Sequence, residues 1–364
     1  MFLDRTCIQP WINVDIYWDG EVWVCCPGWM NTSVGNLLRQ SWDDIWNGEI
    51  IRKIRQSMLD STFEYCKPDD CIFLLDKEIS WPMYATDSSL SENLEEDWGN
   101  LKPIKKYYKN KETYDPIGPA VVTMSYDRSC NLQCPTCRHE IEMYTPKNPF
   151  YNQLLKIHKI VTEVVCKDAD QIIVSGSGDA FGSVLHRDFM RKFDKKNYPK
   201  VEFIYPMTNA VLWDKKMWDS MKGVHPYVKS CYISIDAVTS ETYNKVRTLK
   251  PSHGNFEQLI ENLKFINTIP DLKRIALTFV VSELNYFEVD KFLDMKRYFP
   301  DKDIEFRYYK IMDWGHLGKK YGEYAIHEEN HPKYKDFLEY WEKCEKKIKS
   351  ENLEVKHNLH GLSR

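Results

Sequence analysis

The sequence contains no long run of apolar residues. No stretch approaches the roughly eighteen consecutive apolar residues that mark a membrane-spanning helix. The first seven residues also lack the charged segment followed by an apolar run that is typical of a secretory signal. We therefore expect a cytoplasmic protein that has no membrane partner.

The chain also has little excess charge of either sign. Its 50 Lys and Arg residues nearly balance 54 Asp and Glu residues, which gives a formal net charge of −4. No basic tract is long enough to cover a nucleic acid, so we expect no nucleic-acid partner. The 364 residues, 43% of them hydrophobic and 29% charged, are ordinary for a soluble globular protein with one large or two modest domains.

The sequence is unusually rich in cysteine. Eleven cysteines, an odd number in a chain without a recognisable signal, fit a reducing compartment and metal ligation better than a disulfide framework. Three of them, Cys130, Cys134 and Cys137, have the spacing C-x3-C-x2-C after the β-branched run 121–123, which predicts a buried strand. Thiolates are preferred ligands of iron–sulfur clusters. No other cysteine lies within twenty-five residues, so a four-iron cluster here would keep one iron open for an outside ligand.

Two other interpretations of these three cysteines remain open. They could form part of a zinc site completed by His139, or they could be structural thiols. Zinc sites usually combine paired C-x2-C or Cys/His clusters, which this local pattern does not supply.

The C-x3-C-x2-C spacing resembles the signature of the radical S-adenosylmethionine (SAM) enzymes. That resemblance implies a [4Fe–4S] cluster whose open iron is chelated by the amino and carboxylate groups of SAM. Electron transfer from the cluster then cleaves SAM, and the resulting 5′-deoxyadenosyl radical abstracts hydrogen from a substrate. The family usually has an aromatic residue before the third cysteine, where this chain has Thr136.

Residues 1–80 contain a second group of cysteines. Alternating apolar residues flank Asp19-Gly20, which predicts a β-hairpin that brings Cys25 back toward Cys7. A Lys-Pro-Asp-Asp turn separates Cys66 from Cys71 and can bring both thiols to one site. Between these pairs we predict a helix that begins at Ser41 and carries apolar residues at helical spacing. Those apolar residues are Ile45, Trp46, Ile50, Ile54 and Met58.

The spacing Cys7-x12-Gly20-x4-Cys25, followed by Cys66-x4-Cys71, resembles the SPASM and Twitch auxiliary-cluster modules. The resemblance implies that these four cysteines ligate one auxiliary [4Fe–4S] cluster, while Cys26 matches no required position. Such modules normally follow the radical SAM barrel, whereas this one precedes it. A structural zinc on the same thiolates is the alternative. In either case we expect metal to nucleate the module, because fewer than eighty residues make a small core.

Residues 81–118 change character and are interpreted as an exposed linker with an acidic and then a basic run. The basic and aromatic segment 105–111 could touch an anionic partner, although a solvated linker is the simpler account.

Residues 119–330 alternate short apolar strands with amphipathic helices, which predicts parallel βα units of the α/β class. The predicted strands are 120–125, 171–175, 201–206, 231–236, 274–281 and 303–309.

Six such units resemble the partial (β/α)6 barrel of radical SAM enzymes, in which the site lies at the carboxyl ends of the strands. The loop Gly176-Ser177-Gly178-Asp179 matches the family's Gly-Gly-Glu motif, whose backbone and carboxylate hold the SAM ammonium. Alone, such a loop is a generic turn. Thr208-Asn209-Ala210 resembles the family's Thr-Asn-Gly loop, and we expect Asn209 to lie at the cofactor site.

The end of the fourth predicted strand also resembles SPASM-type enzymes, in which polar residues there contact the SAM ribose. Ser234 and Asp236 occupy these positions and should face the same side of the strand, because side chains alternate. A strand-end capping network is the alternative for this pair.

Cys166, Cys231 and Cys344 are assigned to the core. Residues 331–364 are predicted to form a helix that packs on the barrel or on the amino-terminal module.

The resemblance covers about residues 5–75 and 119–330 and implies a radical SAM enzyme with one auxiliary cluster. That cluster would accept the electron left after hydrogen abstraction, or relay electrons to the SAM cluster. We expect a small-molecule or carbohydrate substrate, with a peptide substrate as the alternative, and an electron donor such as a flavodoxin or ferredoxin. A non-catalytic, metal-stabilised binding protein is a further alternative, which the departures at Ser177 and Asp179 favour. No catalytic acid or base can be assigned.

Overall fold

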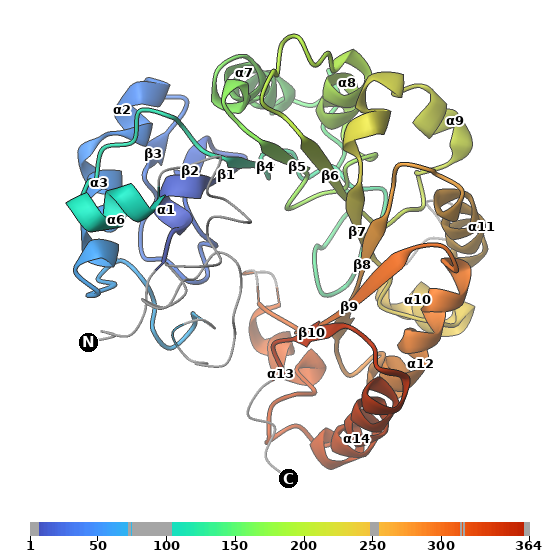
Figure 1. Cartoon of the computed structure of the whole chain (residues 1–364). Helices are drawn as coiled ribbons and strands as arrows, with labels where there is room; N and C mark the ends of the chain where they lie inside the picture. The colour runs from blue at the N-terminus through green and yellow to red at the C-terminus, as the bar shows by residue number, and fades with distance from the viewer. Residues whose placement is uncertain are drawn as a thin grey trace. The chain divides into compact units, whose positions relative to one another are not determined.

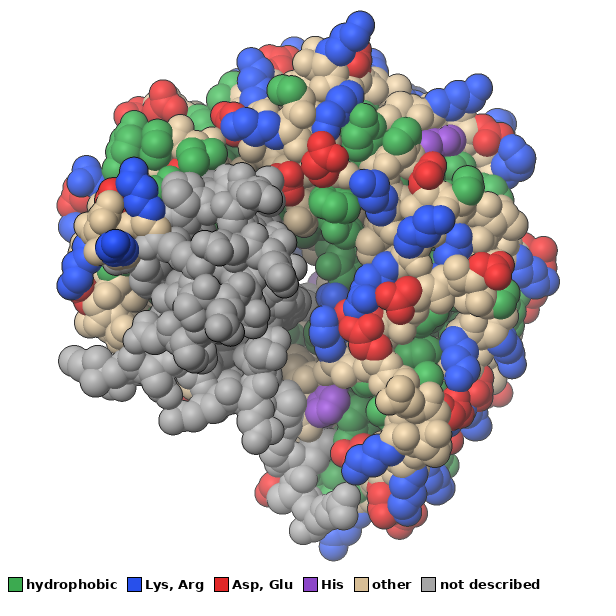
Figure 2. Space-filling view, in the orientation of Figure 1, with side chains coloured by type: hydrophobic (Ala, Val, Ile, Leu, Met, Phe, Trp, Pro, Cys, Tyr) green, Lys and Arg blue, Asp and Glu red, His purple; other side chains and the backbone are tan. Residues whose placement is uncertain are grey.

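The computed structural model describes residues 7–71, 74, 104–247, 255–313, 315 and 317–359 (Figure 1 and Figure 2). Residue contacts divide the chain into two compact units. The first contains the residues up to 127 together with 146–177 and 193–204, and the second contains 128–145, 178–192 and 205 onward. This division differs from the predicted domain boundaries at 80, 118 and 330, which remain a prediction.

The first unit contains a mixed sheet with the strand order β5-β4-β1-β2-β3. Strands β1 and β2 pair antiparallel around the predicted Asp19-Gly20 turn, where Gly20 has a φ of +86°. Strand β1 also pairs in parallel with β4, with Val14 opposite Val122, and β4 pairs in parallel with β5. The predicted hairpin is therefore confirmed, and it shares a sheet with the first predicted barrel strand. The strands are β1 (Asn13–Ile16), β2 (Glu21–Trp23), β3 (Gly35–Asn36), β4 (Val121–Met124) and β5 (Gln171–Val174).

In the first unit, two helices replace the single helix that the sequence predicted from Ser41. Ser41 caps the first of them as expected, since its Oγ accepts a hydrogen bond from the Asp44 N–H at 3.2 Å. The helix ends before Gly48, however, where a β-carbon would lie 2.0 Å from the Asp44 carbonyl oxygen, and a second helix begins after it. Ile50 is consequently 42% exposed rather than part of the buried stripe. The helices are α1 (Gln9–Ile12), α2 (Trp42–Trp46), α3 (Glu49–Leu59), α6 (Ile104–Asn110) and α7 (Tyr151–Glu163), with a 3-10 turn η1 (Val165–Lys167).

The described part of the predicted linker, residues 104–118, has exposed lysines as predicted, but it also packs on the first unit through buried side chains. Tyr107 on α6 is buried, its hydroxyl donates to Asp115 Oδ1 at 2.8 Å, and its ring stacks on Trp11. Arg55 of α3 is also buried and donates from Nη1 to the Thr113 carbonyl oxygen at 2.9 Å. The lysine run is solvated as predicted, but the sequence did not predict that the interspersed Tyr107 side chain anchors the segment in the core.

The second unit contains parallel strands in the order β10-β9-β8-β7-β6. Its helices lie between consecutive strands in the chain, and α9, α11, α12 and α14 lie along one side of them (Figure 1). All six predicted strands are present across the two units, so the α/β class with a mostly parallel sheet is confirmed. The strands are β6 (Phe203–Thr208), β7 (Ser230–Ser234), β8 (Arg274–Val281), β9 (Asp303–Lys310) and β10 (Val355–His357).

The helices of this unit include α14, which corresponds to the predicted carboxy-terminal helix. It packs on α12, and its Trp341 ring lies 5.2 Å from the Tyr308 ring of β9. Cys344 on this helix, Cys231 in β7 and Cys166 in η1 are fully buried, which confirms their assignment to the core. Among the described residues, no helix combines the length and apolar character that crossing a membrane requires. The helices are α8 (Val184–Lys192), α9 (Lys215–Asp219), α10 (Ser240–Val246), α11 (Phe256–Asn267), α12 (Val289–Phe292), α13 (Tyr321–Tyr324) and α14 (Tyr334–Glu351).

Candidate functional site

The loop that carries the three clustered cysteines belongs to the second unit. Its Cys130 N–H donates to the Glu142 carbonyl oxygen at 2.9 Å, and the Cys137 N–H donates to the Cys134 carbonyl oxygen at 2.9 Å. Cys130 and Cys134 are buried around the fully buried Leu132, whereas Cys137 is exposed. The loop is thus held by its own backbone hydrogen bonds, with one of its three thiols facing solvent.

Two arginine side chains lie against the sulfur atoms of this loop. Nη1 of Arg247 is 3.7 Å from Sγ of Cys134, and Nη2 of Arg138 is 3.6 Å from Sγ of Cys137. Both guanidinium groups remain charged at any physiological pH, so they favour thiolates and an anionic cluster at this position. Sequence reasoning missed Arg138, although its place directly after Cys137 was a signal for it.

The protonation of the buried cysteines shows what metal binding requires. Burial raises the pKa of the Cys130 thiol to about 12. It raises the pKa of the Cys134 thiol to about 11, with the charge of Arg247 opposing the shift. Without metal both groups are neutral thiols at pH 7, so a bound metal must displace their protons. A donor set of three free thiols fits an iron–sulfur cluster.

Asn209, the middle residue of the predicted Thr-Asn-Gly-like loop, lies beside the same cysteine loop. Its Nδ2 is 3.6 Å from Sγ of Cys130 and donates to Asn131 Oδ1 at 2.9 Å. The following Ala210 has a φ of +62°, a conformation that glycine adopts more readily. The structure therefore brings this predicted site residue together with the first cysteine.

Asp179, predicted to hold the SAM ammonium, has its carboxylate occupied by the protein itself. Oδ2 accepts from Thr208 Oγ1 at 2.8 Å and from the Asn209 N–H at 2.7 Å. Oδ1 accepts from the Phe181 and Gly182 N–H groups at 2.9 and 3.0 Å. The side chain is buried, and these contacts assign it to positioning Asn209 and the start of α8. Its role as a SAM ligand remains a prediction that these contacts do not favour.

The rest of the predicted glycine loop is divided between the two units. Gly176 and Ser177 belong to the first unit and Gly178 belongs to the second. The Ser177 hydroxyl donates to the Ser125 carbonyl oxygen, and a β-carbon on Gly176 would lie 2.0 Å from Ser125 Oγ. Glycine is required at position 176 because the loop approaches β4 so closely.

Replacing Gly176 by alanine should lower the thermal midpoint of unfolding. The new methyl group must displace Ser125 or the loop backbone, and such overpacking costs about 1–3 kcal/mol. A matched control is Gly322→Ala, because a β-carbon there would meet nothing within 4 Å. Calorimetry of both variants checks the expectation, and equal midpoints for the two would contradict it.

Ser234 and Asp236 do not share one face of a strand, so that prediction is wrong. Strand β7 ends at Ser234, and Asp236 has a φ of +58°, which interrupts the alternation. The two residues meet through Arg247 instead, whose Nη1 is 3.1 Å from Asp236 Oδ2 and whose Nη2 donates to the Ser234 carbonyl oxygen. Asp236 Oδ1 also accepts from the Val280 N–H at 2.8 Å. These contacts form a strand-end network, and ribose binding by this pair remains a prediction.

The four cysteines predicted to ligate an auxiliary cluster lie in the first unit. Burial raises the pKa of Cys25 well above its usual value, and the nearby thiols of Cys7, Cys71 and Cys26 raise it further. Burial likewise raises the pKa of Cys66 to about 12, with a further contribution from Cys71. The hairpin and the turn after Cys66 therefore bring the four predicted ligands into one electrostatic neighbourhood.

Backbone contacts hold this neighbourhood together. Met30 and Cys66 form an antiparallel bridge, and the Lys67 N–H donates to the Trp29 carbonyl oxygen at 2.8 Å. Within the described ranges, no three Cys, His, Asp or Glu side chains meet as ligands of a single metal ion. Thiolates of a cubane cluster each bind a different iron and need not meet at one point. Zinc, with His139 in the case of the three clustered cysteines, remains the alternative at both groups.

Asp15 on β1 is a polar residue that sequence reasoning did not single out. It lies opposite Thr123 of β4, and hydrogen bonds from the side chains of Ser125 and Tyr17 reach its carboxylate. Burial nevertheless raises the pKa of this carboxyl to about 7. Its alternation with the buried Val14 and Ile16 places it on the other face of the strand, so no sequence signal indicated its burial.

The raised pKa of Asp15 makes the stability of the protein depend on pH. An unfolded Asp has a pKa of about 3.9, so between about pH 4 and 7 the folded state binds more protons and its stability falls as pH rises. Asp15→Asn lacks this dependence and should gain stability relative to the unaltered protein between pH 5 and 8. Denaturant titrations across this range measure the difference, with the exposed Asp43→Asn as a control. A difference that stays constant with pH would contradict the expectation.

Comparison with known proteins identifies the amino-terminal part of the first unit. Residues 7–72 match the family model of SPASM, an iron–sulfur cluster-binding domain. This segment is a SPASM domain, as predicted. The matched residues include all four predicted cluster ligands of the SPASM domain, Cys7, Cys25, Cys66 and Cys71.

Two solved structures are similar to about two thirds of this chain at low identity. The structure of TYW1 with a lysine-pyruvate adduct bound has 15% identity and a TM-score of 0.40, over 63% of this chain and 73% of that one. A radical SAM methyltransferase from Sphaerobacter thermophilus has 8% identity and a TM-score of 0.38, over 67% of each chain. A comparison with curated protein sequences found no match.

Proposed function

We propose that this protein is a radical SAM enzyme with two [4Fe–4S] clusters. Cys130, Cys134 and Cys137 would hold the cluster that binds SAM, and the four cysteines of the SPASM domain would hold an auxiliary cluster. When bound, the first cluster and SAM would supply a 5′-deoxyadenosyl radical that abstracts hydrogen from the substrate. The observation that carries the proposal is the contact of Arg247, Arg138 and Asn209 with the three thiols.

The residues around the cysteine loop have separable tasks in this proposal. Arg247 and Arg138 put positive charge beside two sulfurs, which stabilises the additional negative charge that reduction brings. Asn209 orients Cys130 and is itself fixed by Asp179 through its N–H group. Asn285 donates to the Asp236 carbonyl oxygen at 2.9 Å and thereby fixes the carboxylate that pairs with Arg247. The chain thus supplies charge and orientation to a cofactor that performs the radical step.

The reaction that we propose is an oxidation of a small molecule or carbohydrate. Four thiols in the SPASM domain would leave no iron of the auxiliary cluster open, which favours electron transfer over substrate binding there. The auxiliary cluster would then accept the electron that remains after the substrate loses hydrogen. A peptide substrate is the alternative, and product analysis by mass spectrometry distinguishes the two.

A second candidate is a metal-stabilised binding protein without radical chemistry. The observation that favours it is the carboxylate of Asp179, whose two oxygens each already accept two hydrogen bonds. In this candidate the same loops would serve only to hold the fold around a cluster.

The experiment that tests the proposal is metal analysis and SAM cleavage after reconstitution without oxygen. About eight irons per chain, matching sulfide and dithionite-dependent formation of 5′-deoxyadenosine are the expected result. Four irons with one zinc would retain the radical chemistry but make the SPASM domain structural. Iron without any 5′-deoxyadenosine would favour the binding protein, and zinc without iron would overturn both cluster assignments.

A further inference from the structure

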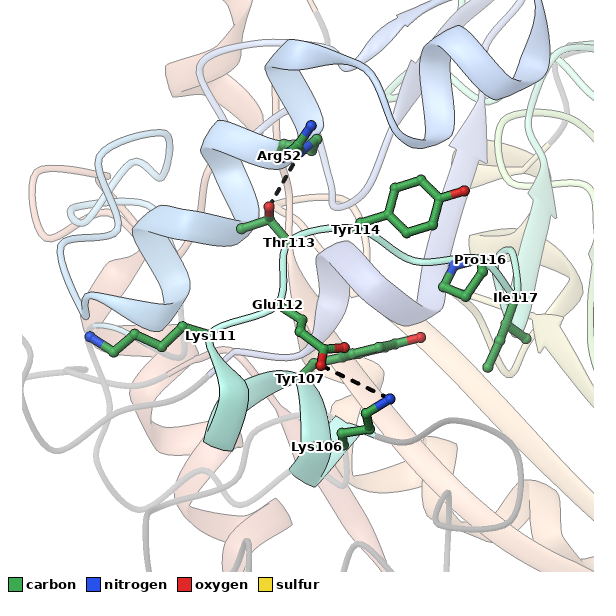
Figure 3. Close-up of a pocket in the computed structure, with 9 residues that line it drawn as sticks. All are labelled: Arg52, Lys106, Tyr107, Lys111, Glu112, Thr113, Tyr114, Pro116 and Ile117. Atoms are coloured by element: carbon green, nitrogen blue, oxygen red, sulfur yellow. Dashed lines mark hydrogen bonds and ion pairs between the residues drawn. The ribbon is translucent and has the colours of Figure 1, made fainter.

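The first unit has a surface pocket that neither cluster assignment uses. It has a volume of about 600 Å³ and lies between α3, α6 and the segment that follows α6 (Figure 3). The residues that matter for its chemistry are Arg52, Lys106, Lys111, Glu112, Tyr107 and Tyr114.

The pocket has more positive than negative charge, and its charges are accessible. Three cations line it against the single carboxylate of Glu112. Lys106 lies 4.0 Å from Glu112 with its side chain 62% exposed, and Lys111 lies 3.7 Å from Asp60 with its side chain 69% exposed. Exposed ion pairs of this kind are weak, so carboxylates of a partner can readily replace the internal ones.

A hydrogen bond and an exposed aromatic ring complete the lining of the pocket. Arg52 reaches from α3 to Thr113, with its Nε 3.3 Å from Oγ1 (Figure 3). Tyr114 is 56% exposed and offers an aromatic surface beside the cations. Exposed tyrosine and arginine side chains are enriched where proteins dock on one another.

The inner side of the pocket connects to the SPASM domain. Tyr107 stacks on Trp11 of α1, with the ring centroids 6.4 Å apart and the planes 20° from parallel. Arg55 joins the same two segments, since it donates to the carbonyl oxygens of Pro10 and Thr113 at 3.0 and 2.9 Å. Helix α1 follows Cys7 by two residues, so the pocket packs on the segment that carries the first cluster ligand.

We infer that this pocket is the docking surface for a small acidic electron-carrier protein that exchanges electrons with the auxiliary cluster. The inference rests on the proposed function in one respect, namely that the SPASM cysteines hold a redox-active cluster. When the carrier donates, it is oxidised by one electron and the auxiliary cluster is reduced by one and relays that electron to the SAM cluster. When the carrier accepts, it removes from the auxiliary cluster the electron left after substrate oxidation, and no bond is made or broken in either exchange. A protein fits better than a small anion because the three cations are exposed around the opening, where they can steer an acidic surface into place.

The test uses the full-length protein with its clusters and a purified flavodoxin as the probe. The variant Arg52→Glu/Lys106→Glu/Lys111→Glu reverses the charge of the pocket, and its iron content verifies that both sites are loaded. We expect flavodoxin to bind this variant at least about tenfold more weakly at low salt. The ratio of the flavodoxin-driven to the dithionite-driven rate of SAM cleavage should fall by a similar factor. The unaltered protein should lose affinity as salt rises, and the variant should respond little.

A matched control is Lys156→Glu/Lys159→Glu, which reverses two exposed charges on α7 of the same unit. It should bind flavodoxin like the unaltered protein. Equal flavodoxin affinity in the pocket variant and the unaltered protein would overturn the inference. An equal loss of the flavodoxin-driven and the dithionite-driven rates in the pocket variant would overturn it too, since the pocket would then contribute to substrate binding or to folding. Failure of the proposed function would appear separately, as no dithionite-driven cleavage in the unaltered protein, and the binding titration would still decide the docking.

Discussion

Replacing Cys134 by alanine should abolish the formation of 5′-deoxyadenosine and remove about four irons per chain. The SAM cluster has only three thiolates in the proposed arrangement, and Cys134 is the one that lies against both the side chain and the carbonyl oxygen of Arg247. Losing it leaves two ligands and an unbalanced positive charge. The iron content after anaerobic reconstitution, together with chromatographic detection of 5′-deoxyadenosine, measures both effects.

The matched control for this substitution is Cys166→Ala. Cys166 is likewise buried, but it lies in the core of the first unit and belongs to neither cysteine group. The control removes a sulfur of the same size and should retain all the iron and activity. If Cys134→Ala also retained eight irons and produced 5′-deoxyadenosine, the assignment of the C-x3-C-x2-C loop would be wrong.

Replacing Arg247 by methionine should produce the largest loss of stability among single substitutions near the site. Arg247 and Asp236 form a buried ion pair at 3.1 Å, with side-chain exposures of 11% and 8%. Removing one partner leaves the other charge buried and uncompensated, which costs about 3–5 kcal/mol. Urea unfolding of the metal-free protein measures this loss separately from any effect of cluster binding.

A double variant distinguishes the ion pair from simple loss of packing. Arg247→Met/Asp236→Asn removes both charges and should recover much of the stability that Arg247→Met loses. The exposed pair of Lys264 and Glu261 provides a control, since Lys264→Met should change stability little. If the double variant were no more stable than the single one, the uncompensated charge would not be the cause.

The parts of this fold that sequence predicts are those encoded by local patterns. The six strands follow from short apolar runs, and the hairpin follows from the Asp-Gly turn between alternating segments. Cysteine spacing likewise indicated the SPASM domain through its resemblance to that family, and the family model over residues 7–72 confirms the domain. Each of these signals lies within a window of a few to some tens of residues.

The parts that sequence does not predict depend on contacts between distant residues. Arg247 contacts Cys134 across 113 positions, a separation that no spacing rule covers. Asp179 matched a motif by position, but its Oδ2 accepts from Thr208 and Asn209, donors that only the folded chain brings near. The basic run around Tyr107 suggested solvation because its charge pattern is local, whereas the ring of Trp11 that stacks on Tyr107 lies far away along the chain.

The parallel pairing of β1 with β4 has a consequence for the order of events during protein synthesis. Val14 pairs with Val122, so the first strand waits for its partner while more than a hundred further residues are made. At typical translation rates that delay is roughly 5–20 s. All four SPASM cysteines have left the ribosome before this interval ends, while the edge of β1 that pairs with β4 is still unpaired. The hairpin that leads to Cys25 is therefore made long before the strand that pairs with it in the finished sheet.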